Sequence, residues 1–276
     1  LHWNDNIGKD FQYGANLTLA HNKNEVTKIA NKDGIIHGSG SVLWEGAEEC
    51  FRAEVGKPIG YFYGYKSNGI FQNQEQIDNY KGPKLNGDKT QPGDVIWADT
   101  DNSGTLDAND RTMIGKPNPD WTYGFTLSAD WKGLDFSAFF QGSIGNDIYK
   151  LYRRSNVTFG NYDKSWLNRW HGEGTSNWVP RIIDGDNNNY QVSNFFVEDG
   201  SYMRLKVLQI GYSLPGQMLQ RVGIKGLRFF VQGENLFTIT NIAVMIRKLG
   251  TRRRIRRWNI SASHVLILSV RILHFD

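Results

Sequence analysis

The amino-acid sequence predicts an all-β fold, built from the long antiparallel strands of a transmembrane β-barrel and from long extracellular loops. Two observations favour this fold class. Apolar and polar residues alternate along segments of about ten residues, whereas strands of soluble sandwiches usually have about five or six. The connections between these segments are alternately short and long, as in outer-membrane barrels. No run approaches the roughly 18 apolar residues that a membrane-spanning helix needs.

Five segments carry the strand pattern. They are residues 11–19, 121–131, 134–141, 202–212 and 227–237. The turn Lys132–Gly133 joins two of them, which predicts a β-hairpin. The alternation changes phase at Val207, which predicts a β-bulge. The first three residues are expected to end a strand, and residues 4–10 to form a turn.

The order of the connections assigns each of them to a side of the membrane. Connections 4–10, 132–133 and 214–226 are short or moderate, whereas 24–120 and 143–201 are long. Because the long loops of outer-membrane barrels lie outside the cell, both long connections are expected on the extracellular side. The strands would then turn their apolar face to lipid and their polar face to a wet lumen.

The first long connection contains a run of acidic residues with the spacing of a calcium loop. The candidate ligands, at places 1, 3, 5, 7, 9 and 12, are Asp99, Asp101, Ser103, Thr105, Asp107 and Asp110. Gly104 would permit the sharp bend, and Leu106 would anchor the loop inward. Because Pro92 and Pro117 flank the loop in place of helices, we expect a rigid clasp for Ca²⁺ and not an EF-hand sensor. The alternative is an acidic turn that binds no metal.

Charge and cysteine content limit the remaining classes of protein. Residues 241–276 hold eight Lys or Arg and one acid, which leaves 24 Lys or Arg against 27 acids in residues 1–240. The main part of the chain is therefore slightly acidic, and no nucleic-acid partner is expected. The lone Cys50 excludes an internal disulfide framework and a zinc cluster.

Four segments carry a resemblance to a known family. They are Gly56–Tyr80, Pro92–Phe125, Phe195–Pro215 and Gly233–Thr240, the last reading GENLFTIT. Through these segments residues 1–240 resemble, in sequence and in order, the C-terminal part of a SusC/RagA-type TonB-linked outer-membrane protein (TonB-dependent receptor) of Bacteroidota. The resemblance implies a C-terminal fragment of a large plugged barrel in the cell outer membrane.

The same resemblance implies a function and partners. It implies import of an oligosaccharide or peptide, a SusD-like lipoprotein as lid, and the TonB complex as energy source. The signal peptide, TonB box and plug would precede Leu1, so the chain by itself is expected to be inactive. Trp166, Trp170 and Trp178 are the candidate contacts for substrate or lid, and their alternative role is packing within the loop.

The sequence also bears on two other classes of function. Catalysis is not expected, because no spacing matches G-x-S-x-G, H-E-x-x-H, a P-loop or G-x-G-x-x-G. A secreted all-β carbohydrate-binding module with a structural calcium is the alternative, since the tryptophans could stack on sugars. Tyr61, Phe62, Tyr63 and Tyr65 are expected to form the core of the outer loop and not a sugar platform.

Residues 241–276 depart from the family pattern. They contain one Gly, no Pro and no Tyr, together with a cluster of Arg. With suitable codons, reading Asn241–Gly250 two bases later gives Y-S-G-Y-D-P-E-I-G, which is the continuation expected for the family. We therefore expect a frameshifted replacement of the last loop and strand. A genuine basic arm for nucleic acid or acidic lipid is the alternative.

The DNA at the Thr240 codon tests the frameshift. Loss of one A from an A-run at this point is expected, so restoring that base should restore the family-like continuation. An intact frame that encodes Asn241–Val244 with other codons would overturn the hypothesis.

Overall fold

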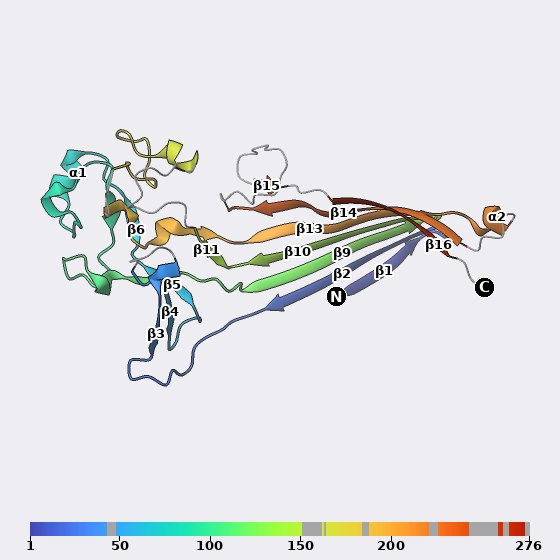
Figure 1. The fold of residues 1–276 in the computed structure, drawn as a ribbon, viewed down its shortest axis with the longest axis horizontal. Coiled ribbons are helices and arrows are strands. Elements are labelled where there is room, and N and C mark those ends of the chain that lie inside the picture. The colour runs from blue at the N-terminus through green and yellow to red at the C-terminus, as the bar shows by residue number, and fades with distance from the viewer. Residues whose placement is uncertain are drawn as a thin grey trace. The chain divides into compact units, whose positions relative to one another are not determined.

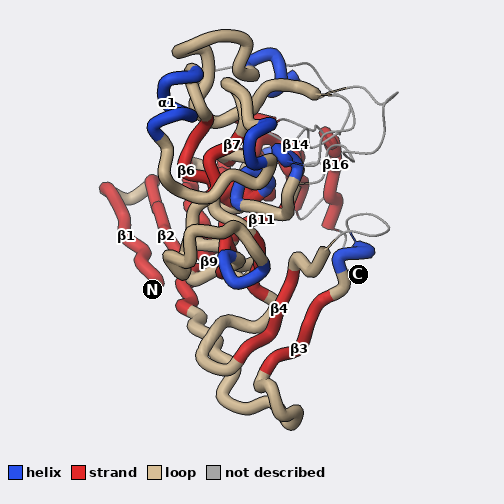
Figure 2. Tube along the Cα trace, turned by 90° about the vertical axis from the view of Figure 1, so that its left-hand side faces the viewer, coloured by secondary structure: helices blue, strands red, loops and turns tan. Residues whose placement is uncertain are grey.

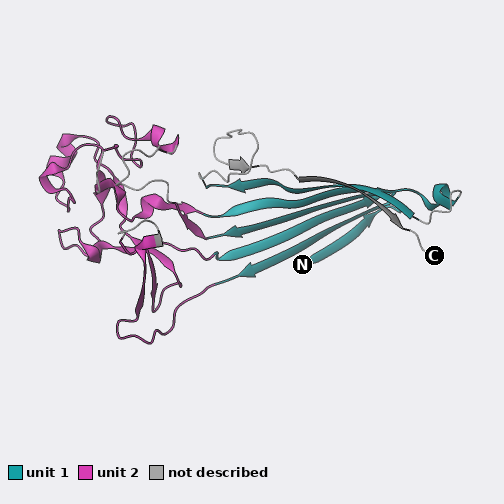
Figure 3. Ribbon diagram, in the orientation of Figure 1, with its two compact units in different colours: residues 1–22, 119–145, 200–276 teal, residues 23–118, 146–199 magenta. Residues whose placement is uncertain are grey.

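The structure is a computed structural model that describes residues 1–42, 48–150, 162, 164–183, 188–220, 226–242, 259–261 and 265–273. The chain divides into two compact units (Figure 3). The first comprises residues 1–22, 119–145 and 200–276, and the second comprises residues 23–118 and 146–199. Among the described helices, none is both long and apolar enough to cross a membrane.

The first unit is an antiparallel sheet (Figure 1). Its strands are β1 (His2–Ile7), β2 (Phe11–His21), β9 (Trp121–Trp131), β10 (Leu134–Ile144), β13 (Tyr202–Ser213), β14 (Gly226–Thr240), β15 (Asn259–Ser261) and β16 (Val265–Leu273). They pair in the order β1-β2-β9-β10-β13-β14, and β14 pairs further with both β15 and β16. The short helix α2 (Gly216–Leu219) precedes β14. The predicted all-β antiparallel fold is confirmed, and the described sheet is open, not a closed barrel.

The strand register places apolar residues in rows along one face of the sheet. One row, at the start of β2, contains Phe11, Trp131, Leu134, Tyr212 and Phe229. A row at the other end contains His21, Trp121 and Ile144, and the first two rings lie 4.4 Å apart between centroids. Because side chains alternate between faces with period two, the intervening odd positions of β2 and β9 share this face.

The apolar face is solvent-accessible in the structure. Large side chains on it that are exposed are Leu17, Leu19, Leu127, Phe136, Ile210 and Val231. The opposite face carries polar side chains, and its cross-strand partners include Ser128 with Ser137 and Gln209 with Gln232. Arg228 also reaches Asp135 on this face through two hydrogen bonds, one of 2.9 Å from Nε to Oδ1.

The expected bulge is present at Lys206. Phe139 pairs with Val207 and Phe140 with Leu205, so the residue between them on β13 has no partner on β10. The register with β14 shifts at the same place, where Asn235 adopts a φ of 51°. The bulge explains why the apolar residues of β13 change parity along the strand.

The expectation of a turn over residues 4–10 is wrong. β1 continues to Ile7 and pairs with β2 from His2 to Ile7, which leaves only residues 8–10 for the turn. The asparagines of this segment look like turn residues in the sequence. However, Asn4 and Asn6 fall on the polar face, opposite Gly14 and Gln12, where amide side chains are tolerated.

Part of the tail is paired in the sheet. β16 pairs antiparallel with residues 226–234 of β14, and β15 pairs with residues 238–240. Residues 243–258, 262–264 and 274–276 of the tail lie outside the described residues. The frameshift origin of residues 241–276 therefore stays a prediction.

The two long connections together form the second unit. Its strands are β3 (Ile35–Gly38), β4 (Phe51–Glu54), β5 (Tyr61–Gly64), β6 (Ser67–Ile70), β7 (Val95–Trp97), β8 (Thr112–Gly115), β11 (Asp147–Tyr149) and β12 (Val197–Asp199). They pair as β3-β4-β5-β8, β6-β7 and β11-β12. Figure 2 shows β3 and β4, which pair antiparallel, lying side by side in this unit. Helix α1 (Gln74–Asn79) is capped by Asn73, whose Oδ1 accepts from the Gln76 N–H at 2.9 Å. Short 3₁₀ turns are Gly40–Val42, Gly87–Lys89, Ala108–Asp110, Lys164–Asn168, Asn188–Tyr190 and Asn194–Phe196.

Aromatic side chains form the core of the second unit. The expected core residues Tyr61, Phe62, Tyr63 and Tyr65 are all less than 9% exposed, which confirms that prediction. Cys50 is also fully buried, and burial raises the pKa of its thiol to about 12.

A buried carboxylate joins the two long connections. Asp94 has no exposed surface, and its Oδ1 accepts from Arg181 Nε at 2.6 Å and from Asn189 Nδ2 at 3.1 Å. Its Oδ2 accepts from the Gln91 N–H at 2.9 Å and from Arg181 Nη2 at 3.2 Å. The Arg181 guanidinium therefore neutralises the buried charge, and two neutral N–H donors complete the hydrogen bonding that a buried carboxylate requires.

We expect Asp94→Asn to destabilise the second unit by about 3 kcal/mol, because it removes one partner of a buried ion pair and turns an amide N–H toward donors. Hydrogen exchange of the amides of β7, measured by mass spectrometry, would report this. Asp88→Asn, at an exposed position nearby, is the control and should change stability by less than about 0.5 kcal/mol. Equal protection in both variants would contradict the role of Asp94.

Candidate functional site

The acidic loop lies between β7 and β8. Its C-terminal part is the 3₁₀ turn Ala108–Asp110, which begins with a reciprocal capping box. Asp107 Oδ1 accepts from the Asn109 N–H at 2.7 Å, and Asp110 Oδ2 accepts from the Asp107 N–H at 2.9 Å. The capping box fixes the backbone of the last ligand places before β8 begins.

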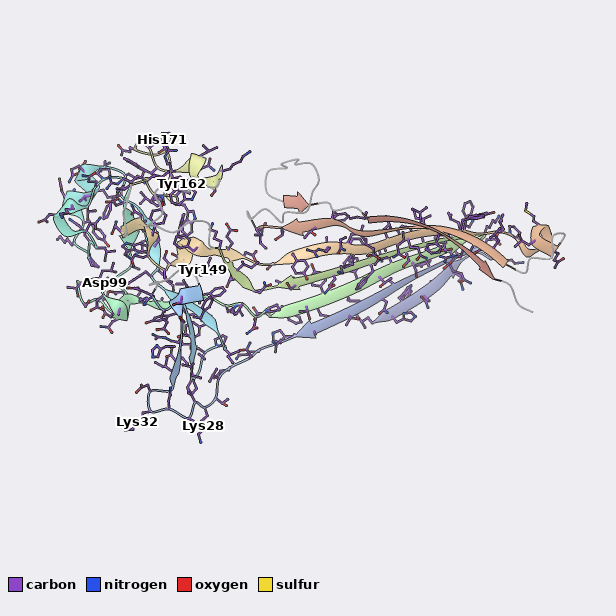
Figure 4. The ribbon with its side chains drawn as sticks, viewed as in Figure 1. Lys28, Lys32, Asp99, Tyr149, Tyr162 and His171 are labelled. Atoms are coloured by element: carbon purple, nitrogen blue, oxygen red, sulfur yellow. The ribbon has the colours of Figure 1, made fainter. Side chains whose placement is uncertain are left out.

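Three of the six candidate ligands converge. Carboxylate oxygens of Asp99, Asp101 and Asp110 lie within 4.8 Å of one another. Asp110 is fully buried, whereas Asp101 is exposed. Figure 4 shows Asp99 among the side chains of this loop. The loop thus presents carboxylate oxygens at a buried position, Asp110, and at a solvent-exposed position, Asp101.

Backbone amides hold these carboxylates in place. Asp99 accepts from the Ser103 N–H at 3.1 Å and from the Gly104 N–H at 2.8 Å. Asp110 Oδ1 accepts from the Thr100 N–H at 2.7 Å. Hydrogen bonds from Ser103 also keep the pKa of the Asp101 carboxyl below its ordinary value. The bonding favours the ionised carboxylate, which is the form that a cation needs.

The other three candidate ligands make contacts within the loop. The Ser103 hydroxyl donates to the Thr105 carbonyl at 3.0 Å. Asp107 serves as the cap described above, and it is not in the converging group. Gly104 has a φ of 79°, the left-handed conformation expected for the sixth place. A set made only of oxygen donors fits a hard cation such as Ca²⁺ better than Zn²⁺.

The loop is anchored to the core of the second unit. Leu106 packs against the buried cluster of Tyr65, Val95 and Trp97, the inward position that its place in the sequence predicts. The Tyr63 hydroxyl lies 3.4 Å from the Ala108 carbonyl, which accepts from it. These contacts make the loop part of a packed unit.

Arg111 is a further anchor that the sequence pattern did not identify. Its guanidinium donates to the Glu49 carbonyl, pairs with Glu48 at 3.3 Å and lies over the Tyr63 ring at 5.1 Å. Its position directly after the twelfth place of the loop was the available signal. The sequence does not indicate its partners, because Glu48 and Glu49 lie about 60 residues earlier in the chain.

The three candidate tryptophans are placed differently. Trp166 is 5% exposed and stacks on Tyr190, with centroids 5.6 Å apart, so it packs within the core and has almost no surface for a ligand. Trp170 lies against Gly93, where an added Cβ atom would come within 2.5 Å of its ring. Trp178 is 46% exposed, more than either of the other two, although its ring centroid lies 5.9 Å from that of Phe195. A contact with substrate or lid stays a prediction, and it rests mainly on Trp178.

The relatives and solved structures that match this chain belong to one class of protein. No protein-family profile matches the chain. The TonB-dependent receptor P3 of Formosa agariphila is 32% identical over 235 residues, which are 84% of this chain and 23% of that receptor. The TonB-dependent receptor SusC of Bacteroides thetaiotaomicron is 24% identical over 238 residues, 85% of this chain and 22% of SusC. The solved RagAB peptide transporter matches with a TM-score of 0.65 at 25% identity, over 87% of this chain and 25% of that one.

The chain spans about a quarter of the length of these relatives. The relatives are receptors and transporters, in agreement with the expectation that the chain is not an enzyme. Over most of its length, this chain is homologous to the TonB-dependent receptors of the SusC/RagA family.

Proposed function

We propose that this chain forms part of the barrel and outer loops of a TonB-dependent receptor that imports nutrients across the cell outer membrane. The observation that carries the proposal is the exposed apolar face of the eight-stranded sheet. A water-soluble protein would cover such a face, whereas a bilayer covers it without further protein. Homology to TonB-dependent receptors supports the same location.

The length of the strands agrees with a bilayer. From Phe11 to His21 the chain advances ten residues, or about 34 Å at ~3.4 Å per residue. At a strand tilt of ~40° this corresponds to a band about 26 Å tall, close to the ~25 Å of outer-membrane barrels. The aromatic row that contains Trp131 and the row that contains Trp121 would then lie at the two membrane interfaces.

The proposed cargo is an oligosaccharide or a peptide, with a SusD-like lipoprotein as lid and the TonB complex as energy source. The solved relative is named a peptide transporter and is a RagAB complex, so a two-component assembly is known for that protein. The second unit of this chain, made from both long connections, is the part proposed to face the lid. Trp178 is the exposed aromatic side chain proposed for that contact.

A pair of neighbouring substitutions tests the membrane assignment. Leu127→Lys places a charge in the middle of the apolar face, where lipid contact should cost about 2–4 kcal/mol. Thr126→Lys places the same charge on the polar face. In the receptor as produced by its own bacterium, we expect the first variant to be depleted from the outer-membrane fraction and the second to be retained, as judged by quantitative immunoblotting.

The same experiment distinguishes the alternative function. For a secreted carbohydrate-binding module, Leu127→Lys would leave the protein soluble and folded without detergent. Equal amounts of both variants in the soluble fraction, with none in the membrane, would contradict the receptor proposal.

We also propose that the acidic loop binds Ca²⁺ as a structural clasp. The converging carboxylates of Asp99, Asp101 and Asp110 would supply the charge, and their amide contacts would reduce the reorganisation needed on binding. Because Asp101 is exposed to solvent, we expect a weak site like those of extracellular proteins, with a dissociation constant of roughly 10⁻⁴ to 10⁻³ M. The ion would hold the loop in shape and would take no part in catalysis.

Calcium titration tests this clasp. At about 100 times the dissociation constant, Ca²⁺ should stabilise the protein by ~2.7 kcal/mol, which would raise the midpoint of thermal unfolding in detergent. Asp99→Asn and Asp101→Asn should reduce this shift, while Asp88→Asn outside the loop should preserve it. An unfolding midpoint that is the same with Ca²⁺ and with chelator would exclude the site.

A further inference from the structure

The chain contains two Asn–Gly dipeptides, and the structure holds them differently. In such a pair the backbone nitrogen of the glycine can attack the side-chain Cγ of the asparagine. Glycine favours this attack because it has no Cβ atom to obstruct the approach and its φ and ψ are less restricted. Whether the attack takes place depends on how firmly the backbone is held. We propose that Asn86–Gly87 is a site of spontaneous deamidation and that Asn68–Gly69 is protected by the fold.

Asn86 is partly buried and stands directly before an exposed turn. It precedes the 3₁₀ turn Gly87–Lys89, and its side chain makes no capping hydrogen bond. Gly87 is exposed, adopts a φ of 53° and has no atom within 4 Å of the position of an added Cβ. The local contacts are single-turn backbone bonds, such as Gly87 N–H to the Lys84 carbonyl at 3.0 Å. Backbone bonds within a single exposed turn are among the first to open in local fluctuations.

Asn68 lies in β6 and its own side chain is exposed, but the backbone on either side of it is held, and Gly69 is buried. Ser67 and Ile70 pair with Trp97 and Val95 of β7. The Ile70 N–H donates to Asn177 Oδ1 at 3.1 Å, and the Gly69 N–H donates to Ser67 Oγ at 3.2 Å. An added Cβ on Gly69 would come within 2.8 Å of Asn177. To reach the geometry for attack, this segment must break several contacts at once.

The chemical step needs only water. The Gly87 nitrogen loses its proton to solvent and attacks Asn86 Cγ, so an N–Cγ bond forms while the Cγ–Nδ2 bond breaks and Nδ2 leaves as ammonia. The product is a five-membered succinimide. Water then adds to either imide carbonyl and opens the ring to aspartate or isoaspartate. The net change is the uptake of one water, the release of one ammonia and the gain of one negative charge.

The change would occur close to the buried carboxylate. Residue 86 precedes Gln91, whose N–H donates to Asp94 and whose Oε1 accepts from Arg181 Nη1 at 2.8 Å. An isoaspartate at position 86 lengthens the backbone by one carbon immediately before this segment. The proposal therefore makes the turn a slow, age-dependent source of charge and backbone change in the second unit.

Peptide mapping by tandem mass spectrometry tests the proposal on the folded full chain in detergent at mildly alkaline pH. Trypsin releases Leu85–Lys89, which contains Asn86 and no other asparagine. We expect Asn86 to convert about tenfold or more faster than Asn68, since loss of only a few additional hydrogen bonds corresponds to that factor. In denaturant the two sites should react at similar rates, which would attribute the difference to the fold.

Variants provide matched controls. Asn86→Gln should abolish conversion in Leu85–Lys89, because the longer side chain would have to form a larger ring. Asn68→Gln should leave the rate at Asn86 unchanged. If Asn86 stays intact in the folded protein, or reacts no faster than Asn68, the proposal is overturned.

Discussion

The sheet depends on its register. Its strands alternate with period two, so a slip of one residue in any pair would move a complete set of apolar side chains to the polar face. The pairing of Phe11 with Trp131 and of Trp131 with Leu134 starts a row that continues across the sheet. Only with all strands in register does a continuous apolar face arise, and this face is the main physical support for a membrane location.

The bulge at Lys206 shows how the register is kept where the sequence breaks the pattern. Without an extra residue, the apolar side chains of β13 would change faces halfway along the strand. The unpaired Lys206, with Asn235 in a left-handed conformation on β14, absorbs the change. One local irregularity thus preserves a long regular face.

The second unit is held together by contacts between two connections that are far apart in the chain. Asp94 and Arg181 join these connections through a buried ion pair, and Asn189 bonds both Asp94 and the Val95 N–H. The acidic loop gains its order from the same packing, since Leu106 and Ala108 contact Tyr65 and Tyr63. A cation loop supported in this way can be rigid without the helices of an EF-hand.

The sequence by itself determined five of the long strands, β2, β9, β10, β13 and β14, and their faces, because alternation is a local property that each segment displays alone. It also determined the spacing of the acidic loop, the inward position of Leu106 and the burial of the Tyr61–Tyr65 segment. The extent of β1 was not predicted, because Asn4 and Asn6 are typical turn residues and only their pairing with β2 identifies them as strand residues. Only the tertiary structure decided that Trp166 is buried, that Arg111 anchors the loop and that Asp94 meets Arg181. These outcomes depend on which distant segments pack together, and the local pattern of residues does not predict that packing.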